Sequence, residues 1–399
     1  MLNSKKVEEV LTRGIEKIYP SRQSLEKLLA SGKKLRVYQG FDPSMPNLHL
    51  GNYVGLLKLK QFQDLGHEVI FLVGDFTGMI GDPSGKSETR KALTRKQVLL
   101  NAINYKKQAS MLLNFKGKNP AKILYNSKWL AKLSFAEGMR LTSLTTYAQV
   151  IERDMFQKRI KEGKDLFLNE LLYPLMQGYD SVVMDVNLEI GGSDQTFNML
   201  MGRTLMKKIS GKEKFVLTTK LLVDKEGNKV GKTTGNALFL NSTPENFYGG
   251  IMSFPDEVIG LSFELLTEVT LAGIKEKIAS DPMREKKRLA FEIIKLLWGE
   301  ASAAKAQEEF EKQFERREVP QNVEWTQVIE KGEWTISKML PQAIPTFAGS
   351  ATISASKRII EQGGLEFEGQ KINDPHKKVF IQGNELIKLG RRFYKVKTK

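Results

Sequence analysis

The sequence predicts an α/β fold built on a doubly wound, Rossmann-like parallel sheet. Strand-like and helix-like stretches alternate through residues 35–125, as they do in βαβ units. One strand-like run, residues 68–73, is apolar after its first residue, which is typical of a strand buried on both faces of a parallel sheet. Glycine-containing loops follow strand-like runs at Gly40, Gly74 and Gly191. Ligands of such sheets bind beyond the carboxyl ends of the strands, so we expect functional residues in these loops.

The elements of the N-terminal half are predicted in order from their periodicity. The first twenty residues predict an amphipathic helix, with apolar side chains at helical spacing: Val7, Val10, Leu11, Ile15 and Ile18. Strands are then expected at residues 35–41, 68–73 and 121–125, and helices at residues 51–65 and 96–113. No apolar secretion signal and no run of about 18 apolar residues is found, so we expect a cytoplasmic protein without a membrane partner.

Changes in pattern divide the chain into three predicted domains. Residues 1–240 carry the α/β pattern, with an insertion at roughly residues 120–165. Residues 241–330 have mostly helical periodicity, and an expected linker at residues 320–334 leads into the third domain. Residues 331–399 are basic and predict two short helices followed by strands, an α+β domain.

Composition narrows the function. The chain has 62 Lys plus Arg and 46 Asp plus Glu, a formal charge of +16, which favours a polyanionic partner such as nucleic acid. It has no cysteine and three histidines. Thiolate catalysis and Cys-ligated zinc or iron–sulfur sites are therefore excluded, and three histidines are few for a metal cage. We expect no protein-bound metal.

Two short motifs combine residue types that bind phosphate. Residues 49–52, His-Leu-Gly-Asn, open a predicted helix, where N–H groups and the helix dipole attract anions. Residues 229–233, Lys-Val-Gly-Lys-Thr, follow an apolar run and a turn, and two cations there can stabilise a leaving pyrophosphate. Taken singly, each motif also has an ordinary structural interpretation. Residues 49–52 could simply start a helix, and residues 229–233 could form a solvated basic hairpin.

A third pattern fits one wall of a small pocket. Tyr173, Gln177 and Asp180 are spaced at i, i+4 and i+7, which places them on one face of a helix. Pro174 must start or kink that helix. The ordinary alternative for Asp180 is a carboxylate on a helix surface.

These patterns and three others resemble the bacterial tyrosyl-tRNA synthetases, a family of class I aminoacyl-tRNA synthetases. The motifs at residues 49–52 and 229–233 are similar to the two signatures of the class. The other motifs follow in the family's order over nearly the whole chain: Tyr38-Gln-Gly-Phe-Asp-Pro43, Ile80-Gly-Asp-Pro-Ser-Gly-Lys86, Tyr173-Pro-Leu-Met-Gln177-Gly-Tyr-Asp180 and Gly191-Gly-Ser-Asp-Gln195.

The resemblance implies a role for each matching residue. Tyrosine would be bound by Tyr38 and Asp180 at its phenolic oxygen, by Tyr173, Gln177 and Asp82 at its α-ammonium group, and by Gln195 near its carboxylate. ATP would be bound by Gly40, Asp42, His49, Gly51, Gly191, Gly192, Asp194 and Lys232. The catalytic residues would be His49, Asn52, Lys229, Lys232, Thr233, Lys86 and Arg90. Tyrosyl-tRNA synthetases are themselves the known example of about 10⁵-fold rejection of phenylalanine without editing, because a site that pairs with the hydroxyl is left unpaired by its absence.

Two positions depart from the family pattern. Asn52 stands where a second histidine is common, although an amide can still hydrogen-bond a ribose or phosphate oxygen. Val230, Gly231 and Thr233 stand where Met, Ser and Ser are frequent, while both lysines of that motif are kept.

The C-terminal residues 354–399 resemble a small RNA-binding module shared with a ribosomal protein and some RNA-modifying enzymes. The matching motifs are Ser356-Lys-Arg358, Gln362-Gly-Gly364, Gly369-Gln-Lys371 and Leu389-Gly-Arg-Arg392. The resemblance implies that RNA is bound by Lys357, Arg358, Lys371, Arg391 and Arg392.

The function implied is that of a tyrosine–tRNA ligase. Tyrosine would attack Mg·ATP to give tyrosyl-adenylate and pyrophosphate, and the tyrosyl group would pass to the 3′ end of tRNA(Tyr), through positioning and electrostatic stabilisation. The family implies a catalytic domain at residues 1–240, an anticodon-side domain at 241–330, and a homodimer with its interface near residues 133–164. Two alternatives stay open: a tryptophan–tRNA ligase, which the run at residues 51–55 also resembles, and a synthetase-derived RNA-binding protein without activation chemistry.

Overall fold

The computed structural model describes residues 4–83, 92–231, 238–314, 323–344, 352–390 and 392–399. They form two compact units, an N-terminal unit, Met1–Gln307, and a C-terminal unit, Glu308–Lys399. Among the described residues no helix has the length and apolar character needed to cross a bilayer.

A six-stranded sheet forms the centre of the N-terminal unit, in the order β1-β6-β5-β2-β3-β4. Its strands are β1 (Ile15–Tyr19), β2 (Arg36–Phe41), β3 (Glu68–Val73), β4 (Lys122–Tyr125), β5 (Leu188–Gly192) and β6 (Phe215–Thr219). β2 to β6 pair in parallel, whereas β1 pairs antiparallel with β6 at one edge. The predicted α/β class is confirmed, and the strand predictions at β2, β3 and β4 hold to within one residue.

The predicted N-terminal helix is wrong in its second half. α1 (Ser4–Thr12) covers the first part, but Ile15 and Ile18 belong to β1. Gly14 lies between them with φ +67°, a backbone conformation that ends a helix and favours glycine. Apolar spacing over so short a segment does not separate a helix from a helix followed by a strand.

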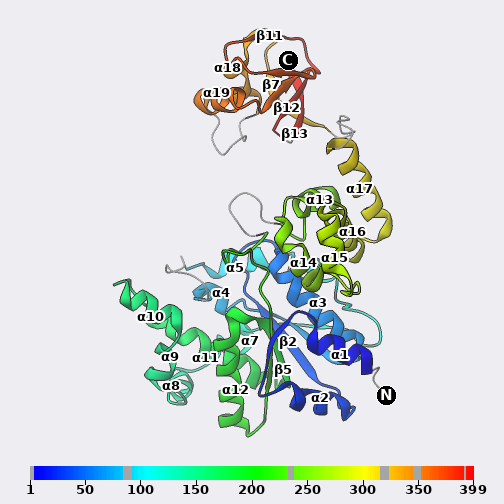
Figure 1. Ribbon diagram of the computed structural model, residues 1–399. Coiled ribbons are helices and arrows are strands. Elements are labelled where there is room, and N and C mark those ends of the chain that lie inside the picture. The colour runs from blue at the N-terminus through cyan, green and yellow to red at the C-terminus, as the bar shows by residue number, and fades with distance from the viewer. Residues whose placement is uncertain (1–3, 84–91, 232–237, 315–322, 345–351, 391) are drawn as a thin grey trace. The chain divides into compact units, whose positions relative to one another are not determined.

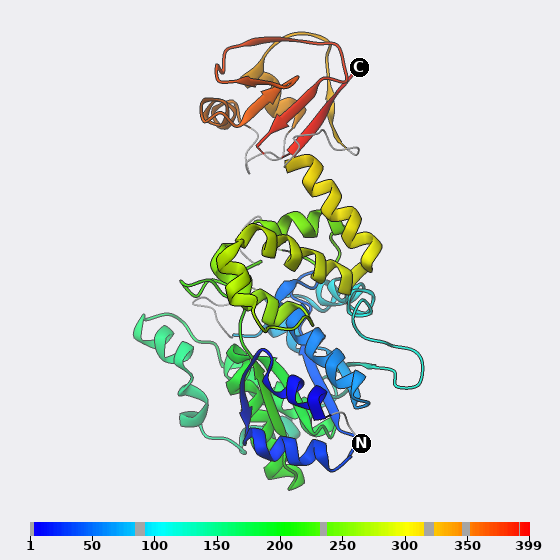
Figure 2. The ribbon, with the colours of Figure 1, turned by 45° about the vertical axis from the view of Figure 1, so that its right-hand side comes forward.

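The two central crossovers place helices on opposite faces of the sheet. β2 leads through α3 (Leu50–Asp64) to β3, and β5 leads through α12 (Thr196–Ser210) to β6, in the opposite direction along the sheet. Because such crossovers are right-handed, the two helices must cover opposite faces, as Figures 1 and 2 show. α11 (Leu168–Val183) packs against α12 and contains Pro174 in its interior.

The crossover from β3 to β4 departs from prediction. The single helix expected at residues 96–113 is two short helices, α5 (Arg95–Ala102) and α6 (Tyr105–Ala109), preceded by α4 (Thr77–Ile80). Asn104, a poor helix former, lies at the break. The Tyr105 hydroxyl donates to the Met45 carbonyl at 2.8 Å, so α6 secures the loop that follows β2.

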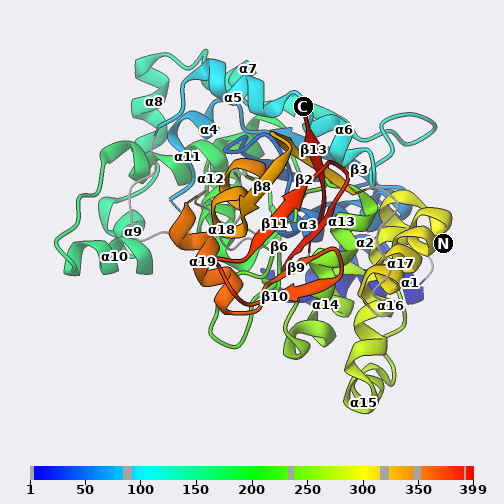
Figure 3. The ribbon, with the colours of Figure 1, turned by 90° about the horizontal axis from the view of Figure 1, so that it is seen from above.

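The insertion after β4 consists of short helices at one edge of the N-terminal unit. They are α7 (Ser127–Leu130), α8 (Phe135–Thr142), α9 (Tyr147–Ile151) and α10 (Asp154–Lys161). Figures 1 and 3 show α8, α9 and α10 beyond α11, away from the sheet. A buried ion pair between Arg159 and Glu170, 2.5 Å apart, ties α10 to α11.

The segment after β6 is helical, as its periodicity predicts. Its helices are α13 (Pro244–Met252), α14 (Ile259–Leu266), α15 (Ile274–Ser280), α16 (Pro282–Trp298) and α17 (Glu300–Phe314). α14 packs on α3, where the buried Tyr53 hydroxyl donates to the Leu266 carbonyl at 2.9 Å. The start of the predicted second domain therefore lies within the N-terminal unit.

The C-terminal unit contains sheets of five and two strands, in the orders β10-β9-β12-β13-β7 and β11-β8. Its elements are β7 (Glu324–Ile329), β8 (Gly332–Thr335), α18 (Ile336–Ala343), α19 (Ile353–Glu361), β9 (Leu365–Phe367), β10 (Gln370–Ile372), β11 (Lys378–Ile381), β12 (Leu386–Leu389) and β13 (Arg392–Thr398). The linker predicted at residues 320–334 is wrong from Glu324 onward, because β7 pairs with β13 and β8 with β11. Those partners lie over 40 residues away, so local composition does not reveal them.

Candidate active site

A cavity of about 250 Å³ opens at the carboxyl ends of the strands, beside β2 and β5. The chain leaves these two neighbouring strands in opposite directions, which is where doubly wound sheets bind ligands. The predicted site residues that line it are Tyr38, Gly40, Asp42, His49, Gly51, Asn52, Asp82, Tyr173, Gln177, Asp180, Gly191, Gly192, Asp194, Gln195 and Lys229. Lys86, Arg90, Lys232 and Thr233 lie outside the described residues.

Asp180 lies at the closed end of this cavity, on α11 and 2% exposed. The Trp129 indole Nε1 donates to Asp180 Oδ1 at 2.7 Å, and Asn126 Nδ2 donates to Oδ2 at 3.2 Å. Burial raises the pKa of Asp180 well above its ordinary value, although these two donors act against that shift. The two donors hold the carboxyl group in one orientation, so it is a preorganised partner for a hydroxyl group.

Tyr38 lies beside this carboxyl group and is fully buried. Its hydroxyl shares a 2.7 Å hydrogen bond with the Ser181 hydroxyl. Burial raises the pKa of Tyr38, and the negative charges of Glu189 and Asp180 raise it further. The Tyr38 phenol therefore stays neutral and can exchange a hydrogen bond with a second hydroxyl group.

The other α11 residues line the side wall. The Tyr173 hydroxyl donates to Asp42 Oδ2 at 2.8 Å, and the Thr77 hydroxyl donates to Asp42 Oδ1 at 2.7 Å. Gln177 Nε2 donates to Glu189 Oε1 at 3.0 Å. Helix α11 therefore presents Tyr173, Gln177 and Asp180 to one pocket, as their spacing predicts.

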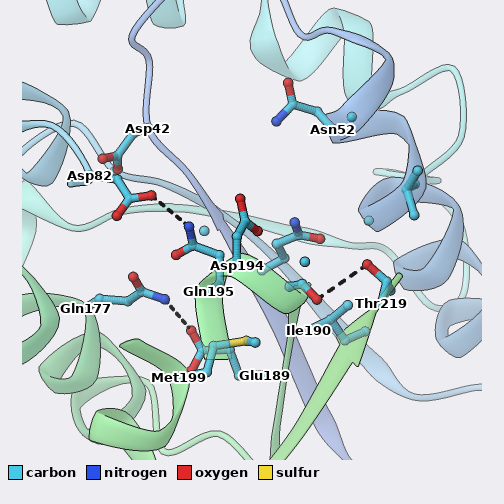
Figure 4. Close-up of a pocket in the computed structure, with 18 of the residues that line it drawn as sticks. Asp42, Asn52, Asp82, Gln177, Glu189, Ile190, Asp194, Gln195, Met199 and Thr219 are labelled. Atoms are coloured by element: carbon cyan, nitrogen blue, oxygen red, sulfur yellow. Dashed lines mark hydrogen bonds between the residues drawn. The ribbon is translucent and has the colours of Figure 1, made fainter. Parts of the chain in front are cut away.

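A third group of polar side chains joins α4 to the start of α12. Gln195 Nε2 donates to Asp82 Oδ2 at 2.7 Å, and Asn198 Nδ2 donates to Gln195 Oε1 at 3.0 Å. Figure 4 shows Asp82 and Gln195 facing each other above Gln177. Asp82 is thus a carboxylate held at the cavity wall, suited to a cationic group.

The motif at residues 49–52, which is predicted to bind phosphate, forms the N-terminus of α3. The His49 side chain accepts from the Asn52 backbone N–H at 3.3 Å, and Asn52 Oδ1 accepts from the His49 N–H at 3.0 Å, a reciprocal capping box. Because Nδ1 accepts, the imidazole proton is on Nε2. A Cβ on Gly51 would lie 2.8 Å from His49 Cε1, so a side chain here would displace the ring. The capping box gives Asn52 a structural role at the position where a second histidine is common in the family.

Lys229 lies opposite, in a strand-like segment bridged to Val223. Its ammonium group is 2.7 Å from Asp194 Oδ2, and both side chains are partly exposed. Asp194 belongs to the 3₁₀ turn Ser193–Gln195 at the end of β5. The cavity therefore has a cation at its open, polar end.

Several site residues were missed from the sequence: Thr77, Asn126, Trp129, Ser181, Glu189, Asn198 and Lys214. Asn126 and Trp129 follow β4, and the carboxyl end of a parallel strand was a usable signal for them. Glu189 is a charged residue between Leu188 and Ile190 in a buried strand. Charged residues are rarely buried without a partner, so this position could also have been identified from the sequence. No local sequence pattern identifies Lys214, because its partner Glu189 lies 25 residues away.

No group of three or more Asp, Glu, His or Cys side chains that could hold a metal ion occurs in the described part of the chain. Of the residues predicted to bind RNA, Arg358 on α19, Lys371 on β10 and Arg392 on β13 are exposed and Lys357 is partly exposed. Arg391 lies outside the described residues.

Comparison with known proteins agrees with this geometry. The model of the family described as tRNA synthetases class I (W and Y) matches residues 30–315. The tyrosine–tRNA ligase of Carboxydothermus hydrogenoformans is 42% identical over 97% of this chain and 97% of its own, and that of Moorella thermoacetica is 38% identical over 96% and 93%. A crystal structure of a C-terminally truncated Aspergillus nidulans mitochondrial tyrosyl-tRNA synthetase has a TM-score of 0.67 at 24% identity, over 77% of this chain and 94% of that one. At that identity it shows the fold alone.

The fold, the cavity and the family match define an enzyme of the class I aminoacyl-tRNA synthetases. Within that class the chain belongs to the tyrosine–tRNA ligases, because full-length relatives of this kind share 38–42% of its residues. The alternatives of a tryptophan ligase and of an RNA-binding protein without activation chemistry are not favoured.

Proposed function

We propose that this cavity is where the tyrosine–tRNA ligase reaction takes place, with tyrosine at the closed end and ATP at the open end. One observation carries the assignment: a buried carboxyl group, Asp180, and a half-exposed cation, Lys229, line the same cavity. The first suits a neutral phenol, and the second suits a charged phosphate chain.

At the closed end, the substrate phenol would donate to Asp180 and exchange a hydrogen bond with Tyr38. Trp129 and Asn126 both donate to Asp180, so its remaining acceptor capacity is directed to the substrate. Phenylalanine would bury this carboxyl group without a partner, which costs affinity. The α-ammonium group would then lie among Asp82, Tyr173 and Gln177, with Gln195 on the carboxylate side.

At the open end, the substrate carboxylate would attack the α-phosphate of ATP, which enters as its magnesium complex. Magnesium is normally held through phosphate oxygens and water, so it belongs to the substrate here. Backbone N–H groups at the start of α3 and the His49 Nε2 proton would contact the phosphates. Lys229, with Lys232 beyond the described residues, would stabilise the charge that develops on pyrophosphate. Asp194, now paired with Lys229, would bind the ribose, while Gly40, Asp42, Gly51, Gly191 and Gly192 would line the nucleotide.

We further propose that the C-terminal unit binds tRNA(Tyr). It has a core of its own, formed by buried residues that include Ile336, Leu340, Ile360 and Ile387. Lys357, Arg358, Lys371 and Arg392 would contact the RNA backbone from its surface. Arg391, which lies outside the described residues, would also bind RNA. As a translation enzyme, the protein is assigned to the cytoplasm.

We also propose a homodimer formed through the insertion and the start of α11. Large apolar side chains are exposed there, including Phe135 (86% exposed), Tyr147 (70%) and Leu168 (78%). Several large apolar side chains this exposed within one insertion favour a protein–protein contact. Sedimentation equilibrium should give twice the chain mass of 45.2 kDa, and Leu168→Asp should shift the protein to monomer. A monomeric wild-type protein at micromolar concentration would exclude this assembly.

Amino-acid-dependent exchange between ATP and pyrophosphate tests the activation chemistry. We expect exchange with tyrosine and none with tryptophan or phenylalanine. Exchange with tryptophan alone would show that the cavity belongs to a tryptophan–tRNA ligase. Absence of exchange with either amino acid would remove activation chemistry from this cavity.

A further inference from the structure

A buried ion pair lies at the side wall of the cavity, and the reaction described above does not use it. Lys214, fully buried, donates to Glu189, which is 1% exposed. Lys214 Nζ also donates to the Met199 carbonyl at 3.1 Å and lies 5.8 Å from the centre of the Tyr38 ring. Glu189 lines the cavity, whereas Lys214 lies outside it.

The space for this lysine is built into the packing of α11 and α12. A Cβ on Gly202 of α12 would lie 2.4 Å from Lys214 Nζ and 2.9 Å from Ser181 Oγ. Any larger residue at position 202 would therefore displace the ammonium group. Burying two charges carries a large desolvation cost that their mutual attraction must offset, so a gain in stability does not explain the pair.

Glu189 connects the pair to the substrate pocket through one hydrogen bond. Its Oε2 accepts from Lys214 and its Oε1 accepts from Gln177 Nε2 at 3.0 Å. A carboxylate can only accept, so the amide nitrogen of Gln177 must face Glu189. The amide oxygen then faces away from Glu189, and Figure 4 shows it directed into the pocket. An oxygen in this position accepts hydrogen bonds from an ammonium group, whereas an amide nitrogen would oppose one.

We propose that Lys214 and Glu189 are positioning residues that set the amide orientation of Gln177 for the α-ammonium group of the substrate. Lys214 keeps Glu189 an acceptor, and Glu189 holds the nitrogen side of the Gln177 amide away from the substrate. In this arrangement Lys214 acts through Glu189, and Glu189 acts through Gln177. The inference rests on the proposed function, since it takes the bound ammonium group as given.

The near-isosteric substitution Glu189→Gln gives the sharpest test. Lys214 still donates, so it would hold the new amide oxygen and turn the new amide nitrogen toward Gln177. Gln177 would then have to present its oxygen to position 189 and its nitrogen to the pocket. Adding Lys214→Met frees the new amide to rotate, so the double variant should return Gln177 to its original orientation.

The measurement uses three ligands that separate the ammonium group from the rest of tyrosine. Dissociation constants are measured for L-tyrosine, for tyramine, which lacks the carboxylate, and for 3-(4-hydroxyphenyl)propionate, which lacks the ammonium group. In Glu189→Gln we expect about 10- to 100-fold weaker binding of tyrosine and tyramine, the range of a lost hydrogen bond to a charged group. The propionate should bind within about twofold of wild type. In pyrophosphate exchange, KM for tyrosine should rise more than kcat falls.

The double variant Glu189→Gln/Lys214→Met should recover tyrosine binding to within about threefold of wild type. Lys212→Met is the matched control, because Lys212 is exposed and pairs with Asp185 on the surface. It should leave all three dissociation constants unchanged. Lys214→Met alone leaves Glu189 buried without its cation, and its folding is checked by thermal denaturation.

Equal weakening of all three ligands in Glu189→Gln would show a structural role and overturn the inference. Unchanged tyrosine binding, or no recovery in a folded double variant, would overturn it as well. A wild-type protein that fails to bind tyrosine at all would instead remove the proposed function, so the two failures are distinguishable.

Discussion

The two ends of the cavity are built differently. At the end proposed for tyrosine, Tyr38 and Asp180 are 0% and 2% exposed, and Asp180 is held by two donors from α7 and its N-cap residue. At the end proposed for the nucleotide, the side chains of Lys229 and Asp194 are 40% and 22% exposed. The first end is closed and preorganised, whereas the second is open to solvent.

This difference fits what each end is proposed to do. Selecting a neutral phenol over a phenyl ring requires buried polar groups, because only a desolvated group is costly to leave unpaired. Pyrophosphate is charged, must leave, and develops charge in the transition state, so a solvent-accessible cation serves it better. Substitutions at the two ends should therefore affect different steps.

The largest effect is expected for Asp180→Asn. The new amide nitrogen would face one of two donors, Trp129 Nε1 or Asn126 Nδ2, and the phenol would lose its carboxyl partner. We expect kcat/KM for tyrosine in pyrophosphate exchange to fall by about 10³ or more, with a much smaller change for phenylalanine. Asp185→Asn, a surface change near the end of α11, is the control. Near-normal selection of tyrosine by folded Asp180→Asn would remove Asp180 from the recognition site.

A smaller, kinetically different effect is expected for Lys229→Ala. Its charge is needed mainly in the transition state, so kcat for adenylate formation should fall by about 10²–10³ while KM for tyrosine changes by less than about threefold. Rapid-quench measurement of adenylate formation separates the two. Lys225→Ala, an exposed lysine paired with Glu257, is the control. A variant that mainly weakens tyrosine binding would contradict the division between the two ends.

The burial of Asp180 also predicts a dependence of stability on pH. Its pKa is raised in the folded state above its ordinary value of 3.8, so the folded protein binds more protons than the unfolded chain in that window. The free energy of unfolding should therefore fall as pH rises from 3.8 through the raised pKa, by at most about 1.4 kcal/mol per pH unit. Denaturant titrations of wild type and Asp180→Asn should differ in this slope, and identical slopes would contradict it.

The smallest effect on tyrosine activation is expected from removing residues 315–399. This deletion leaves α17 intact. Every described residue that lines the cavity precedes Gly231, and Lys232 is also outside the deleted segment, so pyrophosphate exchange should stay within about twofold of wild type. Binding of tRNA should weaken, and the slope of log affinity against log salt should become less steep by about one for each phosphate that the removed unit neutralises in the full-length protein. Unchanged affinity and slope would separate the C-terminal unit from tRNA binding. Loss of exchange would show that the unit supports the catalytic fold.

The sequence by itself determined the α/β class, the strands β2, β3 and β4 and many of the residues that line the cavity. The class and the strands follow from apolar runs, and the pocket face of α11 follows from side chains at i, i+4 and i+7. The other site residues follow from the resemblance of their motifs to a known family. The predictions that were wrong also relied on local patterns. Residues 1–20 repeat an apolar spacing that both a helix and a strand can satisfy, and residues 324–335 have strand partners more than 40 positions away.

Only the tertiary structure decided how the site residues are held. Trp129 and Asn126 reach Asp180 from more than 50 positions away, and Lys214 meets Glu189 between α12 and the sheet. Such pairs leave no periodic trace, because they depend on which strands become neighbours and on where glycine lets two helices approach. Sequence motifs therefore identified side chains that line the cavity, while the packing behind them selected the orientation of each group.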